Sequence, residues 1–276
     1  MRLEVLHEAH RQELRELLLS NLDANLYLLQ LLNTTPIAHN RLVEWIGVFE
    51  DEQLIAMTCT LGRSKDRGPA RLIMVHGRSD GAAYLGRYAM MRGGTELLLG
   101  ERDCTDAYWT SMNSPTPRLF YDQRIYTCTA VSEGERVPIS KATESHYSVL
   151  HRYAAEMMLE DLKRDPRSDE HLHERTVLSR IQLGKTWIYE VDRQIQFMID
   201  VGMESPLGAQ VGGTYVPPEF RGQGLATRGM RAICAELLKG SERVTLHVNE
   251  ANTAAIRCYE RAGFVRETAY RLIALS

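Results

Sequence analysis

The sequence predicts an α/β fold made of two similar halves, and three observations support this. The chain has 276 residues, 44% of them hydrophobic and 25% charged, which is ordinary for a soluble globular protein of one or two domains. Short runs that alternate apolar and polar residues, as half-buried strands do, stand between longer runs at helical spacing. The same order of strands and helices is found before and after Ser132-Glu133-Gly134-Glu135. We therefore predict a tandem repeat, with domains at 1–132 and 133–276.

The first half is predicted to run strand, two helices, strand meander, helix, strand, helix, strand. Leucines at helical spacing predict its first two helices, and the acidic pair Asp51-Glu52 predicts a hairpin turn. The predicted strands are 1–5, 45–50, 53–61, 71–76, 96–99 and 124–131. The predicted helices are 8–19, 21–32, 80–92 and 105–112.

The second half repeats this order. A hairpin is predicted across Asp192-Arg193, and a helix that follows a glycine-rich loop has Ala226, Met230, Ile233 and Leu237 on one face. The predicted strands are 186–191, 194–203, 208–216 and 244–248, with 137–140 leading into the first helix. The predicted helices are 143–160, 169–183, 225–238 and 253–262.

The stretch from Gly212 to Thr227 is the most informative part of the sequence. It begins as a strand, which Pro217 and Pro218 end because proline cannot donate a ladder hydrogen bond. Gly222 and Gly224 then allow a tight turn into a helix whose first N–H groups are free. The helix dipole adds positive charge there, so this turn is an anion cradle, most naturally for phosphate. The alternative is a strand-to-helix turn with no ligand.

The cradle is neither a Walker A loop nor a dinucleotide fingerprint, because it lacks Gly-Lys-Ser/Thr and G-x-G-x-x-G. It matches Arg/Gln-x-x-Gly-x-Gly/Ala through Arg221, Gly224 and Ala226. A second pattern follows, Asn252-x-x-Ala255-x-x-x-Tyr259, closed by Gly263-Phe264. In order and spacing the two patterns resemble the GNAT superfamily of N-acyltransferases, and the likeness covers about residues 135–276. The resemblance implies two GNAT-like domains, each a mixed, mostly antiparallel sheet flanked by helices.

The resemblance also implies roles for particular residues. The pyrophosphate of acetyl-CoA, the co-substrate, would lie on the loop, mainly on its backbone N–H groups, with no metal required. The cofactor-binding residues are then Tyr215, Val216, Arg221, Gly222, Gln223, Gly224, Leu225, Ala226, Thr227 and Asn252. Tyr259 would be the catalytic acid that protonates the departing CoA thiolate, and the acceptor would be an amine.

Each of these residues also has a plain structural interpretation. Asn252 precedes a predicted helix, so it can be an N-cap instead of, or as well as, a contact to the pantetheine arm. Thr227 can face a phosphate or water, and Arg221 can be a solvated surface charge. Tyr259 can be a core aromatic residue with its hydroxyl bonded locally.

The sequence names no general base. The strand at 208–216 holds no Asp or Glu, and the nearby candidates His247, Asp200 and Glu190 each suit a structural role better. A non-catalytic acyl-CoA sensor therefore stays open as an alternative to an enzyme. A ligand-free adaptor is a third possibility.

The bulk properties exclude several classes of protein. The net charge of −3 gives no indication of nucleic-acid or membrane binding. Five widely spaced cysteines without a C-x-x-C pair favour a reducing compartment, so we expect a cytoplasmic protein. The oligomeric state is left open, with a homodimer as one alternative. In the first half, His76–Gly81 lacks the cradle spacing, so we expect that half to be a degenerate copy that binds no CoA.

Overall fold

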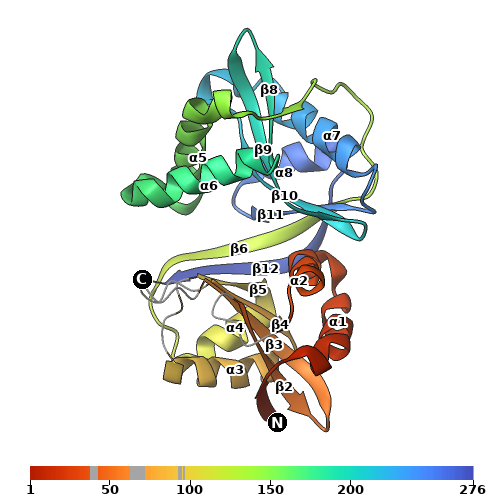
Figure 1. Ribbon diagram of the computed structural model, residues 1–276, viewed down its shortest axis with the longest axis vertical. Helices are drawn as coiled ribbons and strands as arrows, with labels where there is room; N and C mark the ends of the chain where they lie inside the picture. The colour runs from red at the N-terminus through yellow and green to blue at the C-terminus, as the bar shows by residue number, and fades with distance from the viewer. Residues whose placement is uncertain (38–42, 63–71, 93–94, 96, 276) are drawn as a thin grey trace. The chain divides into compact units, whose positions relative to one another are not determined.

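The computed structural model describes residues 1–37, 43–62, 72–92, 95 and 97–275 (Figure 1). The described chain divides into two compact units that do not follow chain order. Unit 1 consists of Met1–Ile125, His247–Ala251 and Glu267–Ser276, and unit 2 of Tyr126–Leu246 and Asn252–Arg266. No helix in the described ranges is long and apolar enough to cross a membrane.

Unit 1 is a mixed sheet with helices on both faces. Its strands are β1 (Arg2–Val5), β2 (Val43–Glu50), β3 (Gln53–Leu61), β4 (Leu72–Gly77), β5 (Leu97–Glu101), most of β6 (Pro117–Cys128) and most of β12 (Val265–Leu275). Its helices are η1 (Glu8–His10), α1 (Arg11–Leu19), α2 (Leu22–Thr34), α3 (Ser79–Arg92) and α4 (Arg102–Ser111). The strand order is β1-β2-β3-β4-β5-β12-β6. Strands β4 and β5 pair in parallel, whereas β1 with β2, β2 with β3, β3 with β4 and β5 with β12 pair antiparallel.

Two apolar layers hold unit 1 together. On one face, leucines of α1 and α2 pack against β2, β3 and β4 through residues such as Trp45 and Met57. On the other face, Leu85 of α3 and Tyr108 of α4 pack against Ile73 and its neighbours. Burying such side chains from both faces is the main favourable contribution to the stability of a sheet of this kind.

Unit 2 has the same plan. Its strands are β7 (Ser140–Lys141), β8 (Thr186–Val191), β9 (Gln194–Ser205), β10 (Gly208–Tyr215) and the first part of β11 (Val244–Asn249), in the sheet order β11-β10-β9-β8-β7. Its helices are η2 (Glu144–His146), α5 (Tyr147–Leu162), η3 (Pro166–Asp169), α6 (Glu170–Gln182), η4 (Pro218–Phe220), α7 (Leu225–Leu237) and α8 (Thr253–Ala262). Strands β10 and β11 pair in parallel, whereas β9 with β10, β8 with β9 and β7 with β8 pair antiparallel.

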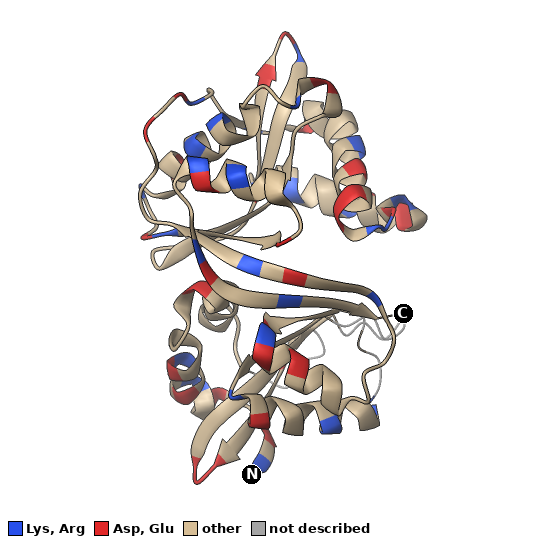
Figure 2. Ribbon diagram, turned by 180° about the vertical axis from the view of Figure 1, so that it is seen from behind, with Lys and Arg blue, Asp and Glu red and all other residues tan. Residues whose placement is uncertain are grey.

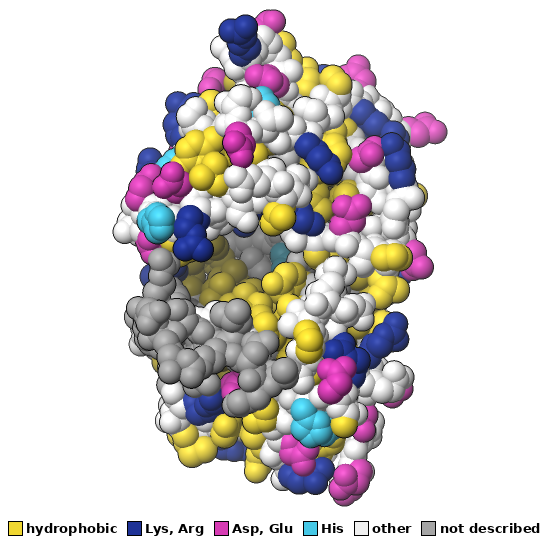
Figure 3. All heavy atoms as spheres, viewed as in Figure 1, with side chains coloured by type: hydrophobic (Ala, Val, Ile, Leu, Met, Phe, Trp, Pro, Cys, Tyr) yellow, Lys and Arg dark blue, Asp and Glu magenta, His cyan; other side chains and the backbone are white. Residues whose placement is uncertain are grey.

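Both predicted hairpins are confirmed. Asp51 and Glu52 have φ of 46° and 64°, and Asp192 and Arg193 have φ of 48° and 63°. Positive φ at both central residues is the two-residue turn whose twist suits an antiparallel pair. Charged residues of both signs are interspersed over the helices (Figure 2) and over the visible face of the molecule (Figure 3), in keeping with the small net charge.

The structure adds one strand that the sequence did not predict and lengthens another. Strand β12 joins the sheet of unit 1 next to β5, with Tyr270 opposite Glu101. Its last six residues are all buried, so the alternation that indicates a strand is absent. Strand β6 begins at Pro117 rather than at the predicted 124. Arg71 and Glu96, the first residues of two predicted strands, lie outside the described residues. The domain boundary at 132 and 133 stays a prediction.

Candidate active site

The site in unit 2 starts where β10 separates from β11. The two strands pair at Ala209 with Val244 and at Gln210 with Thr245. Strand β10 then continues along β9 as far as Tyr215. In the described chain, no β11 partner is assigned to β10 beyond Gln210. Backbone groups on that edge of β10 are therefore open to a ligand instead of to a neighbouring strand.

A β-bulge changes the direction of this open stretch. On β10, Gly213 and Thr214 stand between two paired positions, whereas on β9 only Ile199 does. Gly213 has φ of 62°, and a Cβ there would come within 2.8 Å of Asp200 Oδ2, so only glycine fits without strain. A bulge of this type bends its strand and is common next to active sites.

The loop after β10 leaves a cluster of amides without acceptors. Gly222 and Gly224 have φ of 77° and 73°, and a Cβ at either would meet nothing within 4 Å. Gly224 is the N-cap of α7 and offers no side chain to the helix. After Arg221, the first amide with an acceptor in the described chain is that of Arg228, which donates to the Gly224 carbonyl at 3.1 Å. Free N–H groups and the positive helix end face open space, which is the arrangement that binds anions.

Interactions of the Arg221 and Tyr215 side chains stabilise the loop after β10. Arg221 Nε donates to the Val216 carbonyl at 2.8 Å, and its Nη2 pairs with Glu160 at 3.0 Å. Its guanidinium lies 5.4 Å from the centre of the Tyr215 ring, whose hydroxyl donates to Glu156 at 2.9 Å. These side chains hold the cradle in place, and its binding groups are backbone amides.

Three further predicted residues differ in exposure. Leu225 is buried, Gln223 is exposed, and Ala226 is half-buried. Burial raises the pKa of the Cys258 thiol, and the nearby Thr227 side chain lowers it. Arg228 was not among the residues predicted from the sequence. Its guanidinium contacts the Gln223 carbonyl at 3.4 Å and Glu135 at 3.2 Å, so it adds positive charge beside the cradle.

Helix α8 brings the second group of predicted residues to β10. Asn252 Oδ1 accepts from the Ala255 amide at 3.1 Å, which confirms that Asn252 is the N-cap. Tyr259 is half-buried, and Thr214, a residue of the bulge, is near enough to its hydroxyl to lower its pKa. The structure therefore places the predicted acid beside the open edge of β10.

Tyr259 keeps its proton at neutral pH. Burial raises its pKa above the usual range, the Cys258 thiol and the Asp161 carboxylate raise it further, and the nearby Thr214 lowers it. Asp161, on α5, was not named from the sequence. Burial raises the pKa of Asp161, and Glu160 raises it further. The sequence offers no signal for Asp161, because its effect on the pKa of Tyr259 depends on how α5 and α8 are placed in the folded unit.

The three base candidates from the sequence have other partners. Asp200 accepts from Thr186 at 2.6 Å and from Arg180 at 2.7 Å, and burial raises its pKa. Glu190 faces His146 at 3.5 Å. His247 belongs to unit 1, where burial lowers its pKa to about 4. These contacts agree with the structural roles expected for them.

Comparison with known proteins identifies the kind of domain that holds this site. Residues 155–264 match the model of the acetyltransferase (GNAT) family. The C-terminal half of the chain carries a GNAT acetyltransferase domain. The matched segment includes the bulge, the cradle and Tyr259. A mycothiol acetyltransferase from Thermobispora bispora is 46% identical to the chain over 68 residues, which are 24% of this chain and 23% of the relative. The chain thus aligns with about a quarter of that curated relative.

Solved structures extend the likeness of the GNAT fold to the whole chain. A GCN5-related N-acetyltransferase from Sphaerobacter thermophilus matches with a TM-score of 0.62 at 15% identity, over 99% of this chain and 94% of that one. A tandem GNAT protein from the clavulanic acid biosynthesis pathway matches with a TM-score of 0.55 at 12% identity, over 98% of both chains. At such identities the matches show the fold and nothing further.

Proposed function

We propose that this protein is an N-acetyltransferase that moves an acetyl or other short acyl group from acyl-CoA to a primary amine of a small molecule or peptide. The observation that carries the proposal is the proximity of three features in unit 2. These are the amide cradle at Gly222–Thr227, the open edge of β10 with its bulge, and the Tyr259 hydroxyl at Thr214. Their order along a strand, a loop and a helix fits an elongated acyl-CoA.

The proposed reaction is a direct transfer without a covalent enzyme intermediate. The amine nitrogen attacks the thioester carbonyl carbon, and β10 backbone amides stabilise the oxyanion that forms. The carbon–sulfur bond then breaks, and the CoA sulfur takes the proton of the Tyr259 hydroxyl. The amine loses its own proton to water, and a proton from water restores the Tyr259 hydroxyl.

The remaining assignments belong to this proposal. The catalytic domain is 133–276 and residues 1–132 form a non-catalytic GNAT-like domain. Acetyl-CoA is the co-substrate, and Asn252 contacts its pantetheine arm while also capping α8. All five cysteines are free thiols, which suits a cytoplasmic enzyme.

Release of CoA thiol during incubation with acetyl-CoA and a panel of amines tests the proposal. The panel spans amino acids, peptides, polyamines and amino sugars. We expect acceptor-dependent thiol release that is lost in Gly224→Val. Saturable binding of acetyl-CoA without turnover on any acceptor would instead favour the sensor alternative. Absence of acetyl-CoA binding would contradict both.

A further inference from the structure

A buried carboxylate on β9 lies against the bulge of β10. Asp200 is 8% exposed. Outside residues 212–214, its Oδ2, Cγ and Cβ atoms are the three nearest to a Cβ built on Gly213, at 2.8, 3.3 and 3.4 Å. In register, Asp200 stands opposite Gly212 on β10 and opposite Thr186 on β8. The carboxylate therefore borders the bulge from the neighbouring strand.

Two hydrogen bonds hold this carboxylate in place. Thr186 Oγ1, on β8, donates to Oδ1 of Asp200 at 2.6 Å, and Arg180 Nη1, on α6, donates to Oδ2 at 2.7 Å. The bond from Arg180 joins two charged groups, so it is stronger than a bond between neutral ones. With one bond on each oxygen, the carboxylate is kept in one orientation beside Gly213.

Gly213 does not fix the bulge by itself. Glycine adopts positive φ about as readily as negative φ, so the φ of 62° is one of several conformations open to this residue. A rigid neighbour reduces that freedom, and Asp200 is the neighbour in contact there. A bulge bends its strand and increases the local twist, so it sets the direction of the backbone N–H groups beside it.

We propose that Asp200 is a positioning residue, which holds the bulge so that the amides on the open edge of β10 face the thioester oxygen. This inference rests on the function proposed above. It assigns no proton transfer to Asp200, because both of its oxygens accept hydrogen bonds from Thr186 and Arg180. The effect falls on the transition state, in which the oxyanion forms, more than on the binding of acetyl-CoA, which the cradle amides at 222–227 support.

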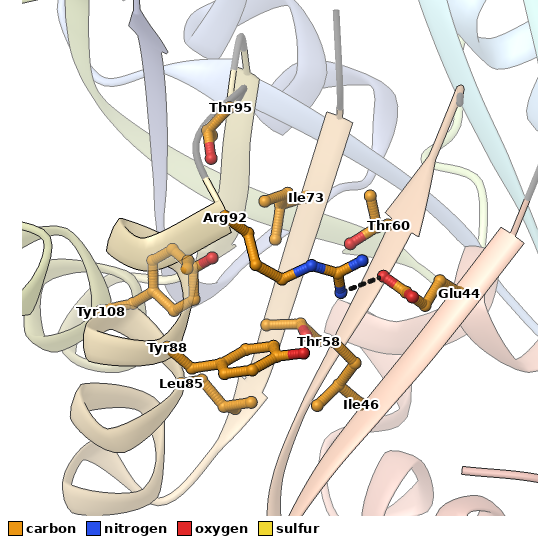
Figure 4. A pocket seen from close by; sticks show the side chains of 11 residues that line it. Glu44, Ile46, Thr58, Thr60, Ile73, Leu85, Tyr88, Arg92, Thr95 and Tyr108 are labelled. Atoms are coloured by element: carbon orange, nitrogen blue, oxygen red, sulfur yellow. Dashed lines mark hydrogen bonds and ion pairs between the residues drawn. The ribbon is translucent and has the colours of Figure 1, made fainter. Parts of the chain in front are cut away.

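Unit 1 contains a matched pair of residues without a bulge. Glu44 on β2 is also 8% exposed, stands opposite Thr60 on β3, and accepts a hydrogen bond from Arg92 of α3 at 2.8 Å (Figure 4). The pairing of β2 with β3 is regular at this position. Glu44→Ala therefore removes a carboxylate of equal burial with an arginine partner on a helix, but not one that borders a bulge.

Steady-state kinetics and calorimetry with acetyl-CoA on the full chain test the proposal. We expect Asp200→Ala to lower kcat by at least about tenfold, which is part of the roughly 10²–10³-fold cost of losing one oxyanion donor, with the acetyl-CoA affinity little changed. Asp200→Asn should keep most of the kcat, because its Oδ1 can accept from Arg180 while its Nδ2 donates to the Thr186 hydroxyl. Glu44→Ala should keep the kcat of the wild type.

Two outcomes of these measurements would overturn the proposal. The first is a wild-type kcat in folded Asp200→Ala. The second is an equal loss of kcat in Asp200→Ala and Asp200→Asn, which would mean that the charge of Asp200 matters and not its hold on the bulge.

Nuclear magnetic resonance gives a second readout that does not depend on turnover. In protein with isotope-labelled glycine, Asp200→Ala should give broadened or doubled signals for Gly212 and Gly213, because the bulge then exchanges between conformations. The wild type, Asp200→Asn and Glu44→Ala should give single sharp signals. If the wild type acetylates no amine, the proposed function fails, and these signals alone decide whether Asp200 holds the bulge.

A further variant covers the case in which Asp200→Ala does not fold. Arg180→Met releases only Oδ2 of Asp200 and takes its place in both experiments, with a smaller loss of kcat and the same broadening expected. Single sharp signals for Gly212 and Gly213 in the folded variant would overturn the assignment.

Discussion

Units 1 and 2 share an order of elements but differ at their parallel strand pairs. In unit 1, β4 and β5 pair at four positions, from Leu72 with Leu97 to Val75 with Gly100. In unit 2, β10 and β11 pair at two positions before β10 continues without β11. The longer pairing in unit 1 therefore occupies the backbone edge of β4 at the position where the corresponding edge of β10 in unit 2 is left without a neighbouring strand.

Side chains reinforce this closure in unit 1. His76 Nδ1 lies 2.6 Å from Glu101 Oε1, so the residues directly after the paired stretches are joined to each other. His76 Nε2 also lies 2.9 Å from the Leu17 carbonyl, and the imidazole is buried. Among the described residues, no such side-chain bridge joins the ends of the β10 and β11 pairing.

The helix that follows each pair shows the same contrast. At the start of α3, Asp80 Oδ1 accepts from the Gly81 amide at 2.9 Å, and Asp80 pairs with Arg78. Unit 1 thus supplies its own carboxylate at the helix end where unit 2 leaves amides without acceptors. The two units indicate that one topology can be open or closed to an anion, depending on a few side chains after the strands.

The largest expected effect tests the open cradle. Gly224→Val would place a branched side chain in space that holds no protein atom within 4 Å of the added Cβ, at a residue with φ of 73°. We expect acetyl-CoA binding to be abolished while the protein stays folded, as measured by calorimetry and circular dichroism. Gly184→Val, at φ of 62° after α6, is the matched control for backbone strain and should keep its affinity. Unchanged affinity in folded Gly224→Val would remove the cradle from the site.

The second prediction concerns the acid. Tyr259→Phe should keep the fold and the acetyl-CoA affinity but lower kcat by about 10²–10⁴-fold, the usual contribution of a positioned general acid. Tyr126→Phe, which removes a hydroxyl bonded to Glu260 at 3.3 Å, is the control and should have a small effect. If chemistry limits the rate and Tyr259→Phe retains the kcat of the wild type, Tyr259 is a packing residue.

The third prediction concerns acid stability, through His247 in unit 1. Its folded-state pKa, about 4, lies below the usual 6.5, so the unfolded chain binds the proton first as the pH falls. Its contribution to stability is complete above pH 6.5 and is lost as the pH falls towards 4. Between pH 8 and pH 5 we expect this group to cost about 2 kcal/mol of unfolding free energy. Urea unfolding at both pH values should show a smaller loss in His247→Leu.

The exposed His171 provides the comparison for that experiment. His171→Leu should leave the pH dependence as it is in the wild type. An equal loss of stability in wild type and His247→Leu would mean that the imidazole is not held neutral by burial in unit 1.

The last prediction is that Asp80→Ala has no effect on the number of acetyl-CoA sites. Asp80→Ala removes the carboxylate from the start of α3, but β4 and β5 stay paired and His76 stays on Glu101. Titration with acetyl-CoA should therefore give one site per chain in the wild type and in Asp80→Ala. Two sites in the wild type would contradict the degenerate character of residues 1–132. A second site in the variant alone would mean that Asp80 is the main obstacle in unit 1.

Local chemistry made much of this protein predictable from its sequence. Proline ends β10, glycine permits the turn at Gly222 and Gly224, and asparagine caps α8 at Asn252, all through interactions within a few residues. The hairpin turns at Asp51 and Asp192 were predictable for the same reason. The spacing of the two motifs then indicated the GNAT resemblance that the family match bears out for residues 155–264.

Tertiary structure alone decided the rest, because it depends on which distant segments meet. Strand β12 joins the sheet of unit 1, and its fully buried end shows no alternation that could predict a strand. The charge of Asp161, on α5, acts on the pKa of Tyr259, on α8, only because the fold brings both helices into one unit. The pairing of Glu44 with Arg92 likewise joins residues 48 positions apart, across a sheet and a helix. The sequence by itself determined which chemical groups were available. Long-range packing determined which of these groups came together, because the burial of a residue and its distant partners do not depend on its neighbours in the chain.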